Sequence, residues 1–200
     1  MSYACIGIAY PVFALLDQHT DGSIPSYKNG KVIQEAREVN VSKTYSDNPL
    51  YGDDVIQDDE NGLTALAYDF ESTGLTDEDR VLILGETANA NTVTGGYWEG
   101  DNVTPWGGFG FIRRMRHGDG TKKYEAWIAV KIKFQETTQQ TRTKEGQQIS
   151  WGTPRLNGTA AALDVDGSGV NKFRLHETFV TMQAAKDWMN NILNIAAVTT

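Results

Sequence analysis

Carboxylates dominate the residues of this sequence that could do chemistry. They crowd into the stretch 47–60, and no Lys or Arg lies between Lys43 and Arg80. The acidic residues of the stretch are Asp47, Asp53, Asp54, Asp58, Asp59 and Glu60. Glycosidases use paired carboxylates as acid and base, but they need a shielded, asymmetric environment that separates the two pKa values. Carboxylates bunched at a turn are solvated, so this stretch predicts a negative surface rather than an acid–base pair.

Nucleophiles and bases are sparse in the rest of the chain. Catalysis by Ser or Cys needs a base and an orienting acid beside the nucleophile. None of His19, His117 and His176 stands near a nucleophile motif. The single cysteine, Cys5, can form neither an intramolecular disulfide nor a zinc site, and its apolar neighbours in sequence predict a buried thiol. The sequence therefore predicts a protein that is not an enzyme and uses no cofactor.

One segment imitates a calcium loop. Asp164-Val165-Asp166-Gly167-Ser168-Gly169 places oxygens at the first, third and fifth positions of an EF-hand loop, and Gly at the sixth. The twelfth position is Leu175, where the loop needs a bidentate Glu, and no flanking helices are indicated. We therefore interpret the segment as a glycine-rich turn and expect no metal site.

Aromatic residues offer a second binding chemistry. Side chains of this kind can stack on sugars or bases, and those available are Tyr97, Trp98, Trp106, Trp127 and Trp151. Tryptophans in strands more often fill a core or a subunit contact. A monomeric β-sandwich that binds carbohydrate therefore stands as the alternative function.

The totals restrict the class of protein. A chain of 200 residues with a 40% hydrophobic fraction suits one domain over 1–200 with a substantial core. A formal net charge of -8 argues against a nucleic-acid binder, which neutralises phosphates with Lys and Arg. The apolar run 3–16 is interrupted by Gly7 and Pro11 and lacks a basic leader. We expect neither a signal peptide nor a membrane span, and synthesis in the cytoplasm.

A basic block balances the acidic one. Over 113–144 the chain carries Arg113, Arg114, Arg116, Lys122, Lys123, Lys131, Lys133, Arg142 and Lys144, against Asp119, Glu125 and Glu136. Opposite charge blocks in one chain suit self-association, because neighbouring copies can complement each other. An ordinary mixed surface is the alternative interpretation.

Strands must position the acidic stretch. Over 63–71, Thr64, Leu66, Tyr68 and Phe70 alternate with Ala65, Ala67, Asp69 and Glu71, which indicates a half-buried strand. Just before it, Asp59-Glu60-Asn61-Gly62 has the Asn-Gly pair of a tight turn. The sequence predicts an acidic β-hairpin that turns there.

A second hairpin is predicted from 109–116 and 122–134, turned at 117–120. In its second strand one face is expected to hold Tyr124, Ala126, Ile128, Val130, Ile132 and Phe134. Further strands are expected over 31–45, with Val39, Val41 and Tyr45 on one face, and over 147–153. A flexible loop or arm is expected over 17–30, and an irregular loop leading into a strand over 87–108.

Two helices are predicted from their caps. The Thr76 hydroxyl can cap a short helix that Gly85 ends, with Val81, Leu82 and Leu84 as its apolar face. Thr181 caps a terminal helix whose apolar residues are Met182, Ala185, Trp188, Met189, Ile192 and Leu193. The fold class is therefore mainly β (β+α): an antiparallel sandwich or barrel-like subunit with one short internal helix and a C-terminal helix.

The order of these parts resembles a known family of viral proteins. The resemblance covers roughly 31–194, and it rests on layout and local phrases rather than on a catalytic motif. The phrases are DNPLYGDDVIQDDENGLTALAYDF, TDEDRVLILG, GGFGFIRRMRHGDGTKKYEAWIAVKIKF, WGTPRLNGTAA and FVTMQAAKDWMNNIL. The chain resembles the major tail proteins, or tail tube proteins, of long-tailed, siphophage-type bacteriophages.

This resemblance implies a subunit that assembles into hexameric rings, which stack into the hollow tube of the virion tail. DNA would pass through without specific binding, and the implied partners are tape-measure, terminator and distal tail proteins. A related tail-completion or baseplate ring protein would share the fold. A channel for DNA should repel phosphate, so we expect some of Asp53, Asp54, Asp58, Asp59 and Glu60 to line the lumen or contact the next ring.

The basic block then has a role as well. Arg113, Arg114, Arg116, Lys122, Lys123, Lys131 and Lys133 are expected to pair with carboxylates of neighbouring subunits. Because adjacent strand residues point to opposite faces, the acidic residues cannot all face one way.

Overall fold

Strands outnumber helices in the computed structural model, which describes residues 3–33, 36–46, 49–52, 55–59, 62–88, 97–98, 100, 103–138 and 152–196. The elements in chain order are β1 (Ala4–Gln18), β2 (Ser26–Val32), β3 (Ala36–Tyr45), β4 (Pro49–Gly52), β5 (Val55–Asp59), β6 (Leu63–Ser72), α1 (Asp77–Leu84), β7 (Thr87–Ala88), β8 (Tyr97–Trp98), β9 (Gly107–Arg116), β10 (Lys122–Thr138), β11 (Arg155–Ala160), β12 (Arg174–Phe179) and α2 (Met182–Leu193). This confirms the mainly β fold with two helices.

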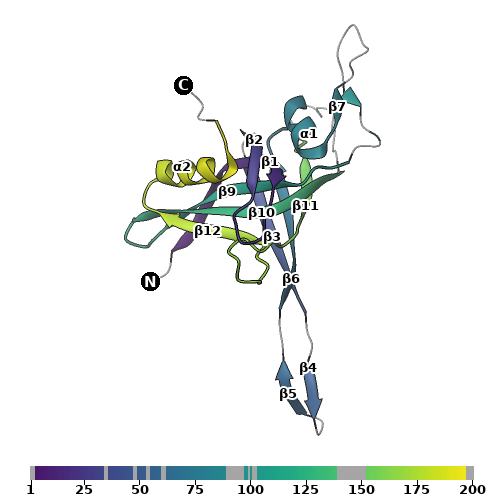
Figure 1. The fold of residues 1–200 in the computed structure, drawn as a ribbon. Helices are drawn as coiled ribbons and strands as arrows, with labels where there is room; N and C mark the ends of the chain where they lie inside the picture. The colour runs from purple at the N-terminus through teal and green to yellow at the C-terminus, as the bar shows by residue number, and fades with distance from the viewer. Residues whose placement is uncertain are drawn as a thin grey trace, which may run out of the picture.

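The main sheet has eight strands in the order β2-β1-β9-β10-β11-β6-β3, and β12 pairs with β10. Its ladders are antiparallel. β12 pairs with the first half of β10 and β11 with the second half. Although β1 and β3 are far apart in the strand order, their side chains pack on one apolar cluster. The sheet therefore curls back on itself, as expected for a sandwich or barrel-like subunit (Figure 1).

The interior of the curled sheet is aromatic. Phe13, Phe70, Phe109 and Phe134 are completely buried there. The Phe109 and Phe134 rings meet edge to face with centroids 5.0 Å apart, a geometry that aromatic pairs favour. Leu66, Tyr68 and Phe70 of β6 all join this cluster, so the predicted alternation of that strand is confirmed.

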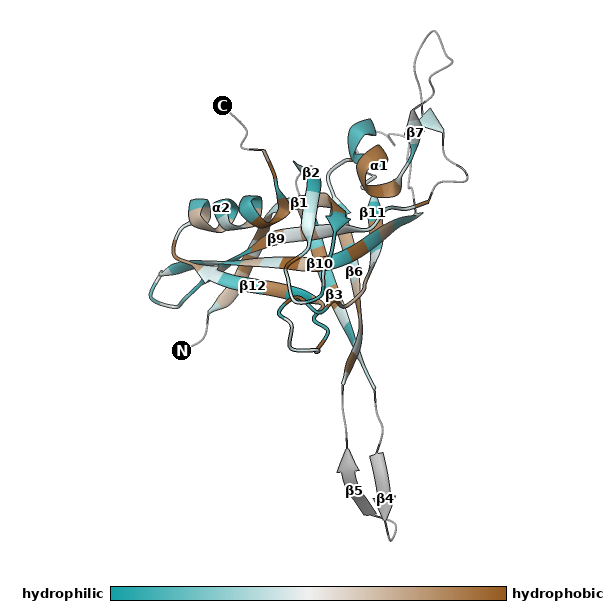
Figure 2. Ribbon diagram, in the orientation of Figure 1, coloured by the Kyte–Doolittle hydropathy of each residue, from teal (hydrophilic) through white to brown (hydrophobic). Residues whose placement is uncertain are grey.

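A second apolar cluster lies on the outer face of the sheet, under α2 (Figure 1). The helix buries Ala185, Met189 and Leu193 against residues of β1, β9 and β10, including Ile112 and Ile128. Figure 2 shows hydrophobic residues interspersed with hydrophilic ones along α2, as expected of a helix with one buried face. The Thr181 hydroxyl accepts a hydrogen bond from the amide of Ala184 at 3.2 Å, which confirms the predicted cap.

β10 contributes to both clusters, which corrects the predicted single face. Ala126 and Ile128 pack under α2, whereas Ile132 and Phe134 lie in the aromatic interior. The β9–β10 register shifts between Ala129 and Ile132, so the strand's alternation changes side there. A prediction that assumes strict alternation along the whole of β10 therefore places half of the strand in the wrong layer.

α1 has the predicted ends. The Thr76 hydroxyl accepts from the amide of Asp79, the Asp79 carboxylate accepts from the amide of Thr76, and Gly85 ends the helix in the left-handed region. The predicted apolar face of α1 is wrong at Val81 and omits Ile83. Ile83 is completely buried, while Val81 is exposed.

Ion pairs fasten α1 to the sheet. Arg80 Nη1 lies 2.9 Å from Glu136 Oε2 on β10 and 3.2 Å from Glu86 Oε1, and all three side chains are largely shielded from solvent. Burial by itself lowers the pKa of Arg80, but hydrogen bonds with Glu136 and Glu86 outweigh it and raise that pKa above the ordinary value. On the other side, Lys31 Nζ of β2 lies 2.8 Å from Glu78 Oε2.

Several N-terminal expectations are corrected. Cys5 is exposed, because its end of β1 lies outside both clusters. The predicted loop over 17–30 shrinks to 19–25, since β1 continues to Gln18 and pairs with β2 from Ser26 onward. The predicted strand 31–45 is split between the end of β2 and β3. Val39 and Val41 pack on the interior, but Tyr45 is exposed.

The later expectations are mixed. The second predicted hairpin is confirmed as β9 and β10. Of the loop predicted over 87–108, β7 and β8 are short strands that pair with each other, and residues 89–96, 99 and 101–102 lie outside the described residues. Of the strand predicted over 147–153, residues 147–151 lie outside the described residues, and 152–153 are not strand. The strand of this region, β11, begins at Arg155.

Candidate assembly surface

The described part of the acidic stretch, β4 and β5, lies at the end of a long arm. β3 and β6 pair from Ala36 and Ser72 outward to Tyr45 and Leu63, and β4 and β5 then pair with each other. Figure 1 shows the β4–β5 hairpin at the far end of this arm, well away from the curled sheet. The described part of this arm consists of two separate ladders: β3–β6, whose root lies in the core, and β4–β5, which lies outside it.

The predicted position of the turn is wrong. Gly52 pairs with Val55, so the chain reverses between them rather than at 59–62. Asp59 pairs with Pro49, and Leu63 pairs with Tyr45, so the strands on either side of the predicted turn do not pair with each other. Residues 60 and 61 of that turn lie outside the described residues. The Asn-Gly pair is misleading because a hairpin turn forms only where the strands on its two sides pair with each other. Here β5 pairs with β4, and β6 pairs with β3.

The structure describes two of the five residues that are expected to line the lumen. Asp58 and Asp59 lie in β5, opposite Leu50 and Pro49 of β4. Asp53, Asp54 and Glu60 lie outside the described residues. The prediction that these carboxylates line a lumen therefore stays a prediction.

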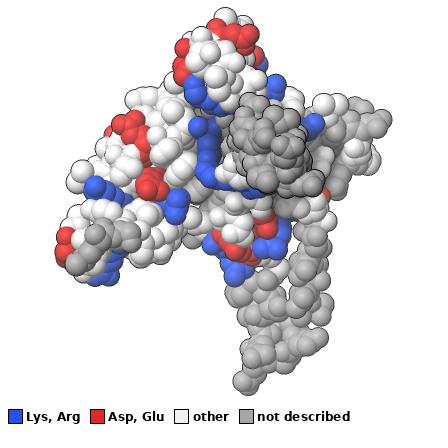
Figure 3. All heavy atoms as spheres, turned by 90° about the horizontal axis from the view of Figure 1, so that it is seen from below, with Lys and Arg blue, Asp and Glu red and all other residues white. Residues whose placement is uncertain are grey.

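A hydrogen bond closes the outer end of the β3–β6 pair, and ion pairs hold the root of the arm. The amide of Ser46 donates to the Gly62 carbonyl at 2.7 Å, and Arg155 of β11 contacts Asp69 and Glu71 of β6 at 3.2 and 3.5 Å. Figure 3 shows Lys and Arg beside Asp and Glu on the described part of the face from which the arm projects. The carboxylates at the root are therefore neutralised within the chain.

The basic candidates divide into two groups, the first of which already has partners. Arg113 Nη1 lies 3.3 Å from Glu125 Oε2. Lys123 Nζ lies over the Tyr3 ring at 4.9 Å. Lys131 and Lys133 both lie 4.9 Å from the centroid of Trp106, as cation–π contacts. These four side chains are engaged within one chain, which weakens the prediction that they pair with a neighbouring subunit.

The second group has no such partner. Arg114, Arg116 and Lys122 lie at the outer end of the β9–β10 hairpin, where Arg116 pairs in register with Lys122. No carboxylate of the described residues lies within ion-pair distance of any of the three. This end of the hairpin therefore keeps positive charge available for another molecule.

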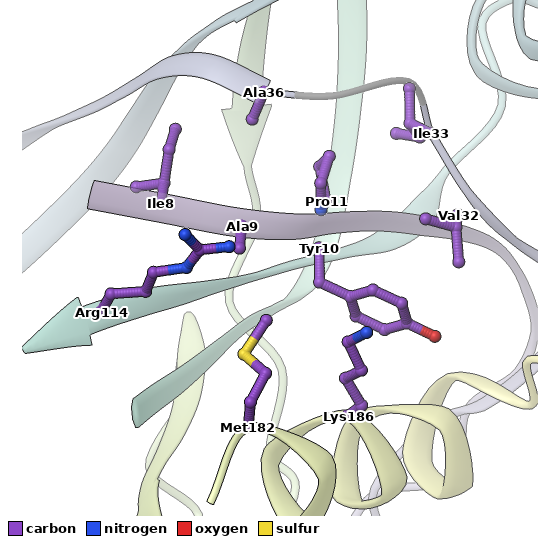
Figure 4. Close-up of a pocket in the computed structure, with 10 residues that line it drawn as sticks. All are labelled: Ile8, Ala9, Tyr10, Pro11, Val32, Ile33, Ala36, Arg114, Met182 and Lys186. Atoms are coloured by element: carbon purple, nitrogen blue, oxygen red, sulfur yellow. The ribbon is translucent and has the colours of Figure 1, made fainter. Parts of the chain in front are cut away.

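A cleft beside Arg114 is the feature that the sequence did not indicate. Its volume is about 460 Å³, and it is lined by residues of β1, the end of β2, the start of β3, β9 and the first turns of α2. Its lining comprises Ile8, Ala9, Tyr10, Pro11, Val32, Ile33, Ala36, Arg114, Met182 and Lys186 (Figure 4). The pairing of β1 with β9 is irregular between Ala9 and Val12, and Tyr10 has a φ of 54°.

The irregularity at Tyr10 is held by α2. The Tyr10 hydroxyl donates to Asn190 Oδ1 at 2.9 Å, and Lys186 Nζ lies over the Tyr10 ring at 4.8 Å. A non-glycine residue at positive φ is strained and persists only where its surroundings enforce it. Sequence patterns could not show this, because the bulge depends on the register between β1 and β9.

The remaining candidates are structural. Asp164 Oδ1 and Oδ2 accept from the amides of Gly167 and Gly169 at 2.9 and 3.0 Å, which closes the glycine-rich turn that the sequence predicted. No group of three His, Cys, Asp or Glu side chains in the described residues could hold a metal ion. Likewise, no helix in the described part is long and apolar enough to cross a membrane.

The three histidines lie in separate places. His19 and His117 each face an aspartate in a turn, and His176 stacks on Trp127 with ring centroids 4.2 Å apart. Amide donation by Thr121, with His117 close by, lowers the pKa of Asp119 to about 2. Tyr97 and Trp98 are exposed on β8, and Trp151 lies outside the described residues.

Comparison with known proteins adds no family. No protein-family model matches this chain, and no curated protein matches it.

Proposed function

We propose that this protein is a structural subunit that self-assembles, through its arm, into stacked hexameric rings that form the tail tube of a long-tailed bacteriophage. The observation that carries the proposal is the β4–β5 hairpin, which lies at the end of the arm away from the core. A two-stranded hairpin alone in water is marginally stable at best. An arm of this kind is stabilised when its tip packs on another molecule.

An open edge of the sheet supports a self-associating subunit. Among the described strands, β3 pairs only with β6, so its other edge is open. The outer edge of β2 is partly covered by the bridge between Gly30 and Ile195 and by the hydrogen bond from Asn194 Nδ2 to the Tyr27 carbonyl. Exposed strand edges favour pairing with further strands, and a ring of subunits removes them. The same chain therefore offers both a projecting arm and an open edge that another copy can cover.

The charge of the tip suits a conduit for DNA. The hairpin sequence 49–59 carries Asp53, Asp54, Asp58 and Asp59 and no Lys or Arg. Negative charge facing a channel repels phosphate and lets DNA pass without binding. The resemblance of the sequence to tail tube proteins points the same way, with tape-measure, terminator and distal tail proteins as partners in the virion tail.

Replacing the arm tests the proposal. Because Ser46 and Gly62 are hydrogen-bonded, residues 47–61 can be exchanged for Asn-Gly, which closes β3 and β6 as a short hairpin. The core residues are untouched, so the thermal unfolding midpoint should stay close to that of the unmodified protein. Rings and tubes should disappear from negative-stain images and from sedimentation profiles.

A second variant separates the length of the arm from its charge. Replacing Asp53 and Asp54 by Lys keeps the arm and leaves Asp58 and Asp59 in place, but turns two carboxylates of the hairpin sequence into cations. In virions carrying these substitutions we expect slowed DNA ejection, and normal ejection would contradict the conduit role. An unmodified protein that stays monomeric at every concentration would contradict the tube and support a monomeric binding module, such as one for carbohydrate.

A further inference from the structure

The cleft at Tyr10 combines an apolar lining with two cations. Ile8, Val32 and Met182 contribute apolar side chains, and Arg114 and Lys186 contribute positive charge. In Figure 4 both cationic side chains lie beside β1, Arg114 near Ala9 and Lys186 near Tyr10. A ligand for this cleft must offer apolar groups and carboxylates together.

The two cations are not neutralised within the described part of the chain. Lys186 has a single ring contact with Tyr10, and Arg114 has no ion pair there. Asp187, the next residue of α2, accepts from Gln183 Nε2 instead. Lys186 is half-buried and Arg114 is exposed. Cations without a counter-charge among the described residues favour an acidic partner, because opposite charges across an interface complement each other.

The chain itself contains a segment of the complementary chemistry. The hairpin sequence 49–59 carries two apolar pairs, Leu50-Tyr51 and Val55-Ile56, each followed by a pair of aspartates, and has no cation. It lies at the end of the arm, on the side of the sheet away from α2 (Figure 1). The hairpin and the cleft of one molecule therefore lie far from each other, and only a second copy can bring them together.

We propose that the cleft formed by Tyr10, Arg114, Met182 and Lys186 of one copy receives the β4–β5 hairpin of the next copy. This deepens the proposed function and rests on it. Because the two surfaces are different, the contact is heterologous. Heterologous contacts generate a ring when the rotation closes and a helical filament when it does not. The irregular part of β1, from Ala9 to Pro11, lines the cleft.

A charge swap tests the pairing in the full chain. Arg114→Glu with Lys186→Glu places like charges in contact, so we expect the protein concentration needed for assembly to rise at least about tenfold. Asp58→Lys with Asp59→Lys should do the same. Because adjacent strand residues point to opposite faces, replacing both Asp58 and Asp59 ensures that the charge facing the cleft is reversed. Combining all four substitutions should restore assembly, because the charges are complementary again.

Cross-linking locates the contact independently of its energy. In a Cys5→Ser background, a variant with Lys186→Cys is mixed with one carrying Asp58→Cys, and disulfide-linked dimers are counted after oxidation. The matched control pairs Asp58→Cys with Lys131→Cys, which lies outside the cleft. We expect cross-links only for the first pair.

The outcomes distinguish the two proposals. If the unmodified protein forms no rings or tubes, the proposed function fails. If it forms them while the cleft variant assembles normally, or the cleft pair gives no more cross-links than the control, only the docking of the hairpin in the cleft is overturned. Circular dichroism of each variant establishes that it is folded.

Discussion

At the residue scale, glycines decide how closely α2 approaches the sheet. A Cβ atom added at Gly108 would lie 2.6 Å from Leu193 Cδ2 and 2.6 Å from Tyr27 Cε1, and one added at Gly110 would lie 2.6 Å from Met189 Cε. Such distances are shorter than any ordinary contact. Close packing therefore requires glycine at Gly108 and Gly110 of β9. No spacing pattern in the sequence indicates which side chains pack on these two glycines.

Gly108→Ala should lower the free energy of unfolding by about 1–3 kcal/mol, since a methyl group must be forced into a filled space. Gly118→Ala is the matched control. Gly118 lies in the exposed turn between β9 and β10, with nothing within 4 Å of an added Cβ. Urea denaturation of both variants measures the difference, and equal stabilities would contradict the role given to Gly108.

At the element scale, β10 joins the parts of the fold. Its first half supports α2 and β12, and its second half pairs with β11 and contacts α1 through Glu136. The irregularity between Ala129 and Ile132 lets one strand serve both layers. Tyr27 holds β10 at this irregularity, because its hydroxyl donates a hydrogen bond to the Val130 carbonyl at 2.7 Å. Burial raises the pKa of that hydroxyl well above its ordinary value.

Glu136→Ala should destabilise the protein by about 2 kcal/mol, because it leaves Arg80 largely shielded with only Glu86 as a partner. The control is Glu177→Ala on β12, where the side chain is exposed. Hydrogen exchange should show the loss concentrated in α1. Unchanged protection of the α1 amides would show that the ion pairs do not fasten this helix.

At the scale of the whole molecule, the negative and positive charges that could link copies lie in separate parts of the fold. The acidic hairpin ends the arm, while Arg114 and Lys186 lie across the sheet beside α2. Charges nearer the root, such as Asp69 and Glu71, are paired within the chain. One molecule therefore presents two complementary and spatially separate surfaces.

Assembly should weaken as salt is added. Raising the ionic strength from about 0.1 M to about 1 M shortens the Debye length from about 10 Å to about 3 Å, which screens exposed charge pairs between copies. Light scattering should show a higher concentration threshold for assembly in high salt. The same threshold should change much less in a variant with Arg114→Gln and Lys186→Gln, and a salt-insensitive unmodified protein would contradict the electrostatic contact.

Local signals in the sequence determined the helices and most strands of this protein. Thr76 and Thr181 cap their helices through bonds to amides three residues away, and the alternation of β6 reports its own burial. Such features depend on neighbours in the chain, so they can be predicted without a partner element. The acidic character of the arm was evident in the same way.

Only the tertiary structure decided what depends on pairing between distant segments. The reversal between Gly52 and Val55, the change of face along β10, the exposure of Cys5 and the cleft at Tyr10 all follow from which strand lies beside which, and in what register. A shift of one residue in register turns every side chain to the other face. That choice is made by the free energy of the whole assembled sheet, so no local pattern could contain it.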